Sequence, residues 1–146
     1  MTAVAFHFNA PDKLAYACRL LRKAVAAGSQ VVVTAPADAL ARLDALLWTF
    51  SQTDFIAHVR QPAEPGVLAA SPVVLTEAPG APGLPHRQVL VNLGVEMPDG
   101  FESYERVIEV VSLDEQDRQQ ARTRWKRYTE LGLDIDRHDL NLKGSP

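Results

Sequence analysis

The sequence contains one cysteine, Cys18, so it cannot form an internal disulfide bond. It has no stretch approaching the roughly 20 apolar residues that cross a bilayer, and its first residues lack the charged start and apolar run of a signal peptide. We therefore expect a cytoplasmic protein without a membrane segment. The net charge of −3 argues against a general attraction to nucleic acid or anionic lipid, so any contact with nucleic acid should be local or indirect.

Motifs for phosphate binding and catalysis are also missing. The turn after the first expected strand reads NAPDK, and neither GxGxxG nor GxxxxGK followed by Ser or Thr occurs, so no glycine-rich loop can cradle a phosphate. There is no Gly-x-Ser-x-Gly motif, and Cys18 falls on the apolar face of a predicted helix, which favours a buried side chain over a nucleophile. The histidines lack metal-ligand spacing: they are His7, His58, His86 and His138. The sequence therefore predicts no catalytic residue, no cofactor and no metal ligand.

The 146 residues, 47% of them hydrophobic, predict one domain spanning residues 1–146. A proline-rich segment from Gln61 to Arg87 should consist of loops around one strand. A Ser-x-x-Glu pattern at Ser112 and Glu115 predicts a capping box that opens the last helix. Strands are expected at residues 3–8, 30–35, 54–59, 71–77, 89–93 and 106–112, and helices at 14–25, 36–48 and 112–131. This order predicts a three-layer α/β fold with a mostly parallel sheet and helices on both faces, Rossmann-like but without a phosphate-binding loop.

Positive charge is concentrated in the last predicted helix. Five basic residues fall within ten positions there: Arg118, Arg122, Arg124, Lys126 and Arg127. At about 100° per residue, Arg118, Arg122 and Lys126 lie within about 80° of one another, with Trp125 beside them. This stripe would suit an acidic peptide with an apolar end, because guanidinium and ammonium groups bind carboxylates and the indole can cover an apolar side chain.

The same stripe is open to two other interpretations. It can be a solvated helix face with Trp125 in the core, or a weak site for single-stranded DNA that stacks on Trp125. Arg124 falls on the apolar side of the predicted helix, where it would have to reach solvent or find a polar partner.

A second feature is the aromatic pair Trp48 and Phe55 at the end of the second predicted helix, in LLWTFSQTDFIAH. Both can be core residues. If either is exposed, the pair is expected to form a protein-binding patch, because aromatic residues are enriched in interface hot spots.

Four segments stand out by their order and spacing. They are the opening AVAFHF, the RLDALLW motif at 42–48 followed by Phe55 and His58, the late strand leading into SLDE, and the ending QQARTRWKRYTELGLDI. Together with the total length, they make the sequence resemble the chi-subunit family of bacterial DNA polymerase III, an accessory protein of the replicative clamp loader. The resemblance implies a fold similar to nucleotide-binding α/β proteins, without catalysis.

The resemblance also implies two partners. The family captures the acidic C-terminal tail of the single-stranded-DNA-binding protein, which ends in apolar residues, and the matching positions here are Arg118, Arg122, Trp125 and Lys126. The other partner is the psi subunit of the clamp loader, or a DinG-type helicase that competes for the same surface, and the matching positions are Trp48 and Phe55.

The chain departs from the family pattern in places. The position of Trp125 is commonly a tyrosine, the proline-rich middle matches poorly, and the segment after Gly132 is acidic enough to compete for the basic stripe. The alternatives from other functional classes are a small nucleotide-handling or hydrolytic enzyme that uses the carboxyl ends of the strands, and a direct single-stranded-DNA binder.

Overall fold

A computed structural model describes residues 2–49 and 56–143, and for residues 142 and 143 only the backbone. The strands are β1 (Ala3–Ala10), β2 (Val31–Thr34), β3 (His58–Arg60), β4 (Val73–Thr76), β5 (Val89–Asn92), β6 (Arg106–Ser112) and β7 (Ile135–Asp139). The helices are α1 (Lys13–Ala26), α2 (Ala37–Thr49), α3 (Pro65–Ala70), α4 (Glu115–Glu130) and α5 (Leu140–Lys143), with a 3-10 turn η1 (Phe101–Ser103).

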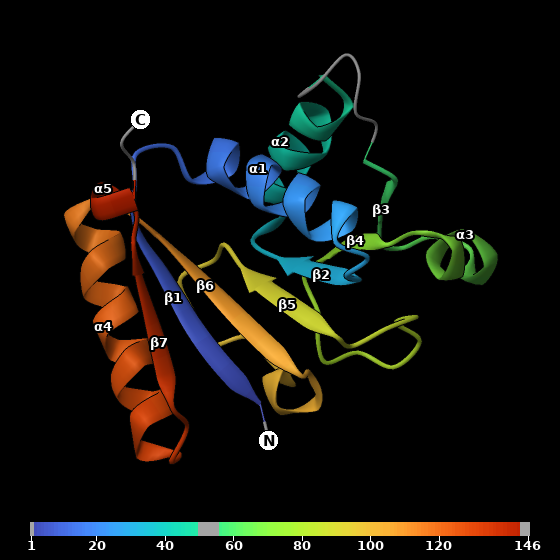
Figure 1. The fold of residues 1–146 in the computed structure, drawn as a ribbon. Coiled ribbons are helices and arrows are strands. Elements are labelled where there is room, and N and C mark those ends of the chain that lie inside the picture. The colour runs from blue at the N-terminus through green and yellow to red at the C-terminus, as the bar shows by residue number, and fades with distance from the viewer. Residues whose placement is uncertain (1, 50–55, 144–146) are drawn as a thin grey trace.

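The strands form one sheet in the order β3-β4-β2-β5-β6-β1-β7, and every neighbouring pair is parallel (Figure 1). The central strands β2, β4 and β5 are short runs whose residues are all buried, as expected where both faces of a parallel sheet are covered. The predicted α/β class with a parallel sheet is confirmed.

Helices cover both faces of the sheet. On one face α1 and α2 pack on the odd-numbered residues of β2, β4 and β5, and the predicted burial of Cys18 in this layer is confirmed. On the other face α3, η1 and α4 pack on Val32, Val74 and Leu90. Among the described residues, no helix combines the length and apolar character that a bilayer span requires.

The last long helix begins later than predicted. Strand β6 runs through Ser112, and the N-cap of α4 is Asp114, whose carboxylate accepts a hydrogen bond from the backbone N–H of Asp117 at 3.1 Å. The predicted capping box at Ser112 and Glu115 is therefore wrong. The Ser112 hydroxyl instead donates to the Asp117 carboxylate at 2.9 Å.

The elements that were not predicted are α3, η1, β7 and α5, and one predicted strand is shifted. The short helix α3 lies in the proline-rich segment, where Pro65 is tolerated because the first turn of a helix leaves its N–H groups unpaired. The edge strand β7 follows α4, and its sequence IDRHD has no apolar alternation because the strand has one neighbour and is partly exposed. The strand expected at 54–59 is observed at His58–Arg60, and residues 54 and 55 lie outside the described part of the chain.

Candidate functional site

The sheet has a switch point where β1 and β6 lie side by side. After β1 the chain enters α1 on one face of the sheet, and after β6 it enters α4 on the opposite face. In open parallel sheets, ligands bind at the carboxyl ends of strands whose connections diverge in this way. A ligand site is therefore expected at this edge of the sheet.

At this edge of the sheet, side chains connect the start of α1 to the start of α4. The ammonium group of Lys13 donates to the Leu93 carbonyl at 3.0 Å and lies 3.1 Å from the Asp117 carboxylate, which also accepts from the Ser112 backbone N–H at 2.8 Å. The carboxylate of Asp12 caps the N-terminus of α1. A phosphate approaching here would meet two carboxylates, so the arrangement disfavours a nucleotide site.

The pKa of Asp117 reflects this bridge. Burial alone would raise the pKa of its carboxyl, but the hydrogen bond from the Ser112 backbone and the nearby Lys13 ammonium outweigh burial and hold the pKa below its ordinary value. Asp117 therefore stays ionised and ties the start of α4 to Lys13 of α1 and to Ser112 at the end of β6.

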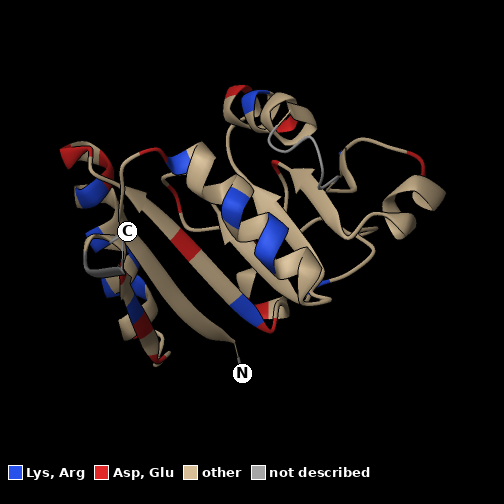
Figure 2. Ribbon diagram, turned by 45° about the horizontal axis from the view of Figure 1, so that its top comes forward, with Lys and Arg blue, Asp and Glu red and all other residues tan. Residues whose placement is uncertain are grey.

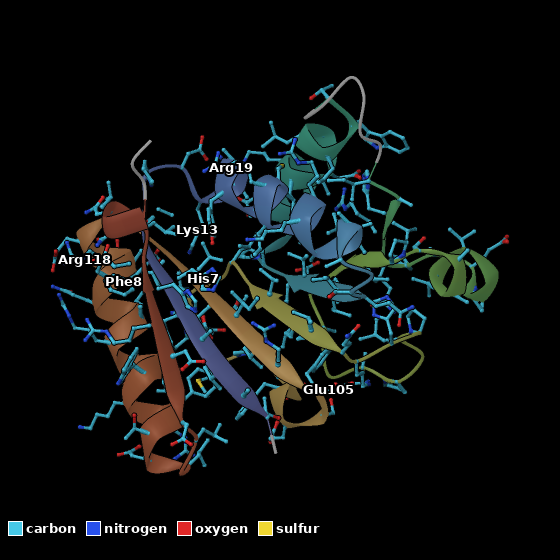
Figure 3. The ribbon with its side chains drawn as sticks, in the orientation of Figure 1. His7, Phe8, Lys13, Arg19, Glu105 and Arg118 are labelled. Atoms are coloured by element: carbon cyan, nitrogen blue, oxygen red, sulfur yellow. The ribbon has the colours of Figure 1, made fainter. Side chains whose placement is uncertain are left out.

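A groove lies on the α4 side of the switch point, between α4 and the ends of β1 and β7. Its volume is about 420 Å³, and none of the described residues lining it is acidic. Figure 3 shows Phe8 and Arg118 beside each other where the end of β1 meets α4. The aromatic and charged residues that line the groove are Phe6, Phe8, Arg118, Arg122, Trp125 and Arg137.

The helical repeat sorts the residues of α4 between the sheet and the groove. The inner face packs on the sheet and consists of Asp117, Ala121, Arg124 and Tyr128. Arg118, Arg122 and Trp125 follow at spacings of four and three residues, so they form the adjoining strip that borders the groove. Figure 2 shows the basic residues of α4 gathered along this helix.

A buried ionic network holds α4 on the sheet. The Arg124 guanidinium lies 3.0 Å from the Glu109 carboxylate of β6, and their side chains are 2% and 0% exposed. The carboxylate also accepts from the Tyr128 hydroxyl at 2.8 Å and the Asn92 amide at 3.0 Å, while Arg124 donates to the Val95 carbonyl at 2.6 Å. Of the two outcomes expected for Arg124, reaching solvent or finding a polar partner, the structure shows the second. This pair fixes the rotation of α4 that turns the basic strip toward the groove.

The cations of the strip are only weakly paired within the protein. Arg122 lies 3.6 Å from the carboxylate of Glu115, but both side chains are more than half exposed, and such surface pairs contribute little. Arg118 forms no ion pair with any described residue. Both guanidinium groups can therefore exchange water for an incoming carboxylate.

The base of the groove is aromatic. Trp125 is half-buried, and its ring centroid lies 5.0 Å from that of Phe6 in the sheet. Phe8 is also half-buried and lines the groove two residues further along β1. Trp125 thus belongs partly to the core and partly to the groove surface, where an apolar side chain can pack against it.

The structure changes the residue set inferred from sequence. It brings Arg118, Arg122 and Trp125 together at the groove, whereas Lys126 is exposed and does not line it. It adds Phe8, which alternation along β1 places on the same face as Phe6, and Arg137 from β7. The alternation was readable in AVAFHF, but no sequence signal pointed to β7. The acidic segment after Gly132 thus also supplies a cation to the groove.

A second surface lies on α2. Trp48 is 60% exposed and Leu46 is 39% exposed, so the interpretation of Trp48 as a core residue is wrong. The Trp48 ring packs against the His58 ring at a centroid distance of 4.9 Å. Phe55, predicted to belong to the same patch, lies outside the described residues.

Comparison with known proteins identifies the family. Residues 1–136 match the family described as "DNA polymerase III chi subunit, HolC". The chain is 36% identical to the DNA polymerase III subunit chi of Pseudomonas aeruginosa over 145 residues, which is 96% of this chain and 98% of that protein. It is 26% identical to the subunit chi of Haemophilus influenzae over 125 residues, 85% of each chain. The chain therefore belongs to the chi-subunit family of DNA polymerase III, the accessory subunits of a bacterial replication polymerase.

Proposed function

We propose that this chain is a non-catalytic adaptor that links the clamp loader of DNA polymerase III to the single-stranded-DNA-binding protein by capturing that protein's acidic C-terminal tail. The observation that carries the proposal is the groove beside α4, where arginines surround an aromatic base and no described lining residue is acidic.

The chemistry of the groove suits the end of such a tail. Arg118 and Arg122 can form charge-assisted, bidentate hydrogen bonds with carboxylates. The rings of Phe8 and Trp125 can cover the apolar side chains that end the tail. A volume of about 420 Å³ accommodates a few residues of an extended chain rather than a folded domain.

The exposed patch of Trp48 and Leu46 is the proposed site for the second partner, the psi subunit or a DinG-type helicase. Helix α2 packs on one face of the sheet and α4 on the other, so the two partners would not compete for space. A modest affinity for the tail is sufficient, because tethering to the clamp loader raises the effective concentration of neighbouring tails.

Replacing Arg122 by alanine is expected to weaken tail binding by about 1–3 kcal/mol, the range for a lost charge-assisted hydrogen bond. The melting temperature should stay within about 2 °C, because the side chain is more than half exposed. Fluorescence anisotropy with a labelled peptide of the ten C-terminal residues of the same organism's single-stranded-DNA-binding protein measures the affinity. Binding should also weaken as salt rises, because exposed ion pairs are screened.

The matched control is Arg127→Ala, which removes an exposed arginine of the same helix that does not line the groove. Equal affinity of the Arg122→Ala variant and the native protein would remove Arg122 from the site. Binding of a labelled oligothymidine with no partner protein would favour a direct single-stranded-DNA binder, and a rise in melting temperature with nucleotides would favour an enzyme.

Replacing Trp48 by alanine is expected to cost binding of the second partner about 2 kcal/mol or more, as truncation of an exposed aromatic anchor does. The free energy of unfolding should fall by less than about 1 kcal/mol, and tail affinity should be unchanged. Calorimetric titration with the purified psi subunit, with Arg42→Ala on α2 as control, measures the effect. Unchanged affinity for psi and for a DinG-type helicase would exclude Trp48 from the second surface.

A further inference from the structure

Arg137 lines the groove from strand β7, a different element from the basic helix α4. It lies on the edge strand β7, where it is paired in register with Phe6 of β1. Partners in register on neighbouring parallel strands point to the same face of a sheet, so Arg137 shares the face on which Phe6 meets α4. The groove therefore has a second cationic wall, built by an element other than the basic helix.

The guanidinium group of Arg137 lies against aromatic rings rather than against a carboxylate. Its central carbon is 5.4 Å from the ring centroid of Phe8 and 5.8 Å from that of Trp125. Arg137 is exposed and forms no ion pair with any described residue. The carboxylate of Asp139, two residues further along β7, instead accepts from the side chain of Asn9 at 2.8 Å.

The contact with the two rings restrains the Arg137 side chain before a ligand binds. A guanidinium group that is restrained by aromatic rings loses less conformational entropy on binding, and its N–H groups can still form a bidentate contact. In the free protein, three guanidinium groups of like charge share one groove of about 420 Å³. Their mutual repulsion falls as carboxylates enter, and a ligand with two carboxylates can pair with both walls at once.

We propose that Arg137 is a specificity-determining residue of the groove, which binds one carboxylate of the acidic tail while Arg118 and Arg122 bind another. The groove then selects chain ends that carry at least two carboxylates next to an apolar residue over ends that carry one. This inference rests on the proposed capture of the tail, and it adds a residue outside the basic helix and a requirement on the ligand.

The test combines variants of the protein with variants of the peptide. The native protein, Arg137→Ala, Arg137→Lys, Arg122→Ala and the control Arg127→Ala are titrated by anisotropy against the ten-residue tail peptide. The peptide series replaces each aspartate by asparagine and each glutamate by glutamine in turn, and one member carries a C-terminal amide. Melting temperatures of all protein variants check that the fold is intact.

Arg137→Ala is expected to weaken binding of the unmodified peptide about five- to thirty-fold, with Arg137→Lys in between and Arg127→Ala within about two-fold of the native protein. The decisive readout is the coupling between peptide variants and protein variants. Removing one particular carboxylate of the peptide should weaken binding to the native protein but hardly change binding to Arg137→Ala. Removing a different carboxylate should hardly change binding to Arg122→Ala. A purely structural role of Arg137 would not produce this selectivity.

Two results would overturn the inference and leave tail capture standing. One is an affinity of Arg137→Ala within about two-fold of the native protein, while Arg122→Ala still weakens binding. The other is a loss in Arg137→Ala by the same factor for every peptide, which means that the residue only supports the rings. If the unmodified peptide fails to bind the native protein, the proposed function and the inference both fall.

Discussion

The Arg124→Met variant is expected to lose about 3–5 kcal/mol of the free energy of unfolding, because it leaves the carboxylate of Glu109 buried without its cation. Glu109 is 0% exposed, and Arg124 is the charged partner among the groups that contact it. Methionine fills a similar volume, so a cavity contributes little to the loss. Urea unfolding followed by circular dichroism measures the change.

The loss should depend on pH in a defined direction. Burial raises the pKa of the Glu109 carboxyl, and Arg124 is the strongest of the neighbours that oppose this rise. Without Arg124 the pKa rises further, so the folded variant binds a proton more readily than the unfolded chain does. Its free energy of unfolding therefore increases as the pH falls from about 8 to about 5, and the deficit relative to the native protein narrows.

Two further variants check the cause. Arg127→Met removes an exposed arginine of the same helix and should change the free energy of unfolding by less than about 0.5 kcal/mol. The double variant of Arg124→Met with Glu109→Gln should be more stable than Arg124→Met alone, because the unpaired buried charge is gone. A deficit that is independent of pH and persists in the double variant would show that packing, not the uncompensated carboxylate, causes the loss.

The Asp117→Ala variant is expected to lose about 2–4 kcal/mol of the free energy of unfolding. The substitution leaves the mostly buried Lys13 ammonium without its carboxylate and the backbone N–H of Ser112 without an acceptor. It also releases the start of α4 from α1, so the melting temperature should fall together with the affinity for the tail peptide.

The deficit of Asp117→Ala also narrows in acid, but in a lower pH window than that of Arg124→Met. The pKa of Asp117 is held below its ordinary value, so its contribution is present above about pH 4 and is lost as the pH falls through the lowered pKa. The deficit of Asp117→Ala should therefore shrink in acid below about pH 4. Asp136→Ala, at an exposed aspartate of β7, is the control. A deficit as large at about pH 3 as at neutral pH would contradict the ionic role of Asp117.

Both variants bear on function because the inner face of α4 positions the groove. Arg124 fixes the middle of the helix on β6, and Asp117 fixes its start beside α1. Arg118 and Arg122 stand on the adjoining strip and follow any rotation of the helix. A loss of tail binding that accompanies a loss of stability is therefore expected for the inner face, whereas Arg122→Ala should affect binding alone.

Much of the fold could be predicted because it depends on local sequence patterns. The β-branched run at 31–34 and the spacing of Ala17, Cys18 and Leu21 depend only on how strands and helices bury one face or two. The start of α4 was misplaced because Ser112 and Asp114 are both good helix caps, and the choice between them depends on how far β6 pairs with its neighbours.

The residues of the candidate site could likewise be predicted only in part. Helical spacing was enough to place Arg118, Arg122 and Trp125 on one strip. It also placed Lys126 in the stripe, because the angular position of a residue around a helix does not show how far a groove beside that helix extends. In the structure Trp125 lines the groove and Lys126 does not. Exposure of Trp48 was equally undetermined, because an apolar ring at the end of an amphipathic helix fits either the core or an interface.

By itself, the sequence determined the parallel α/β class, the absence of a glycine-rich phosphate loop, the family and the basic strip, because each depends on neighbouring residues or on order along the chain. Only the tertiary structure decided which cations reach solvent, and it buried Arg124 against Glu109, fifteen residues earlier on another element. It also brought Arg137 of an unpredicted edge strand to the groove. Contacts between elements distant in sequence depend on packing and desolvation, which no local pattern records.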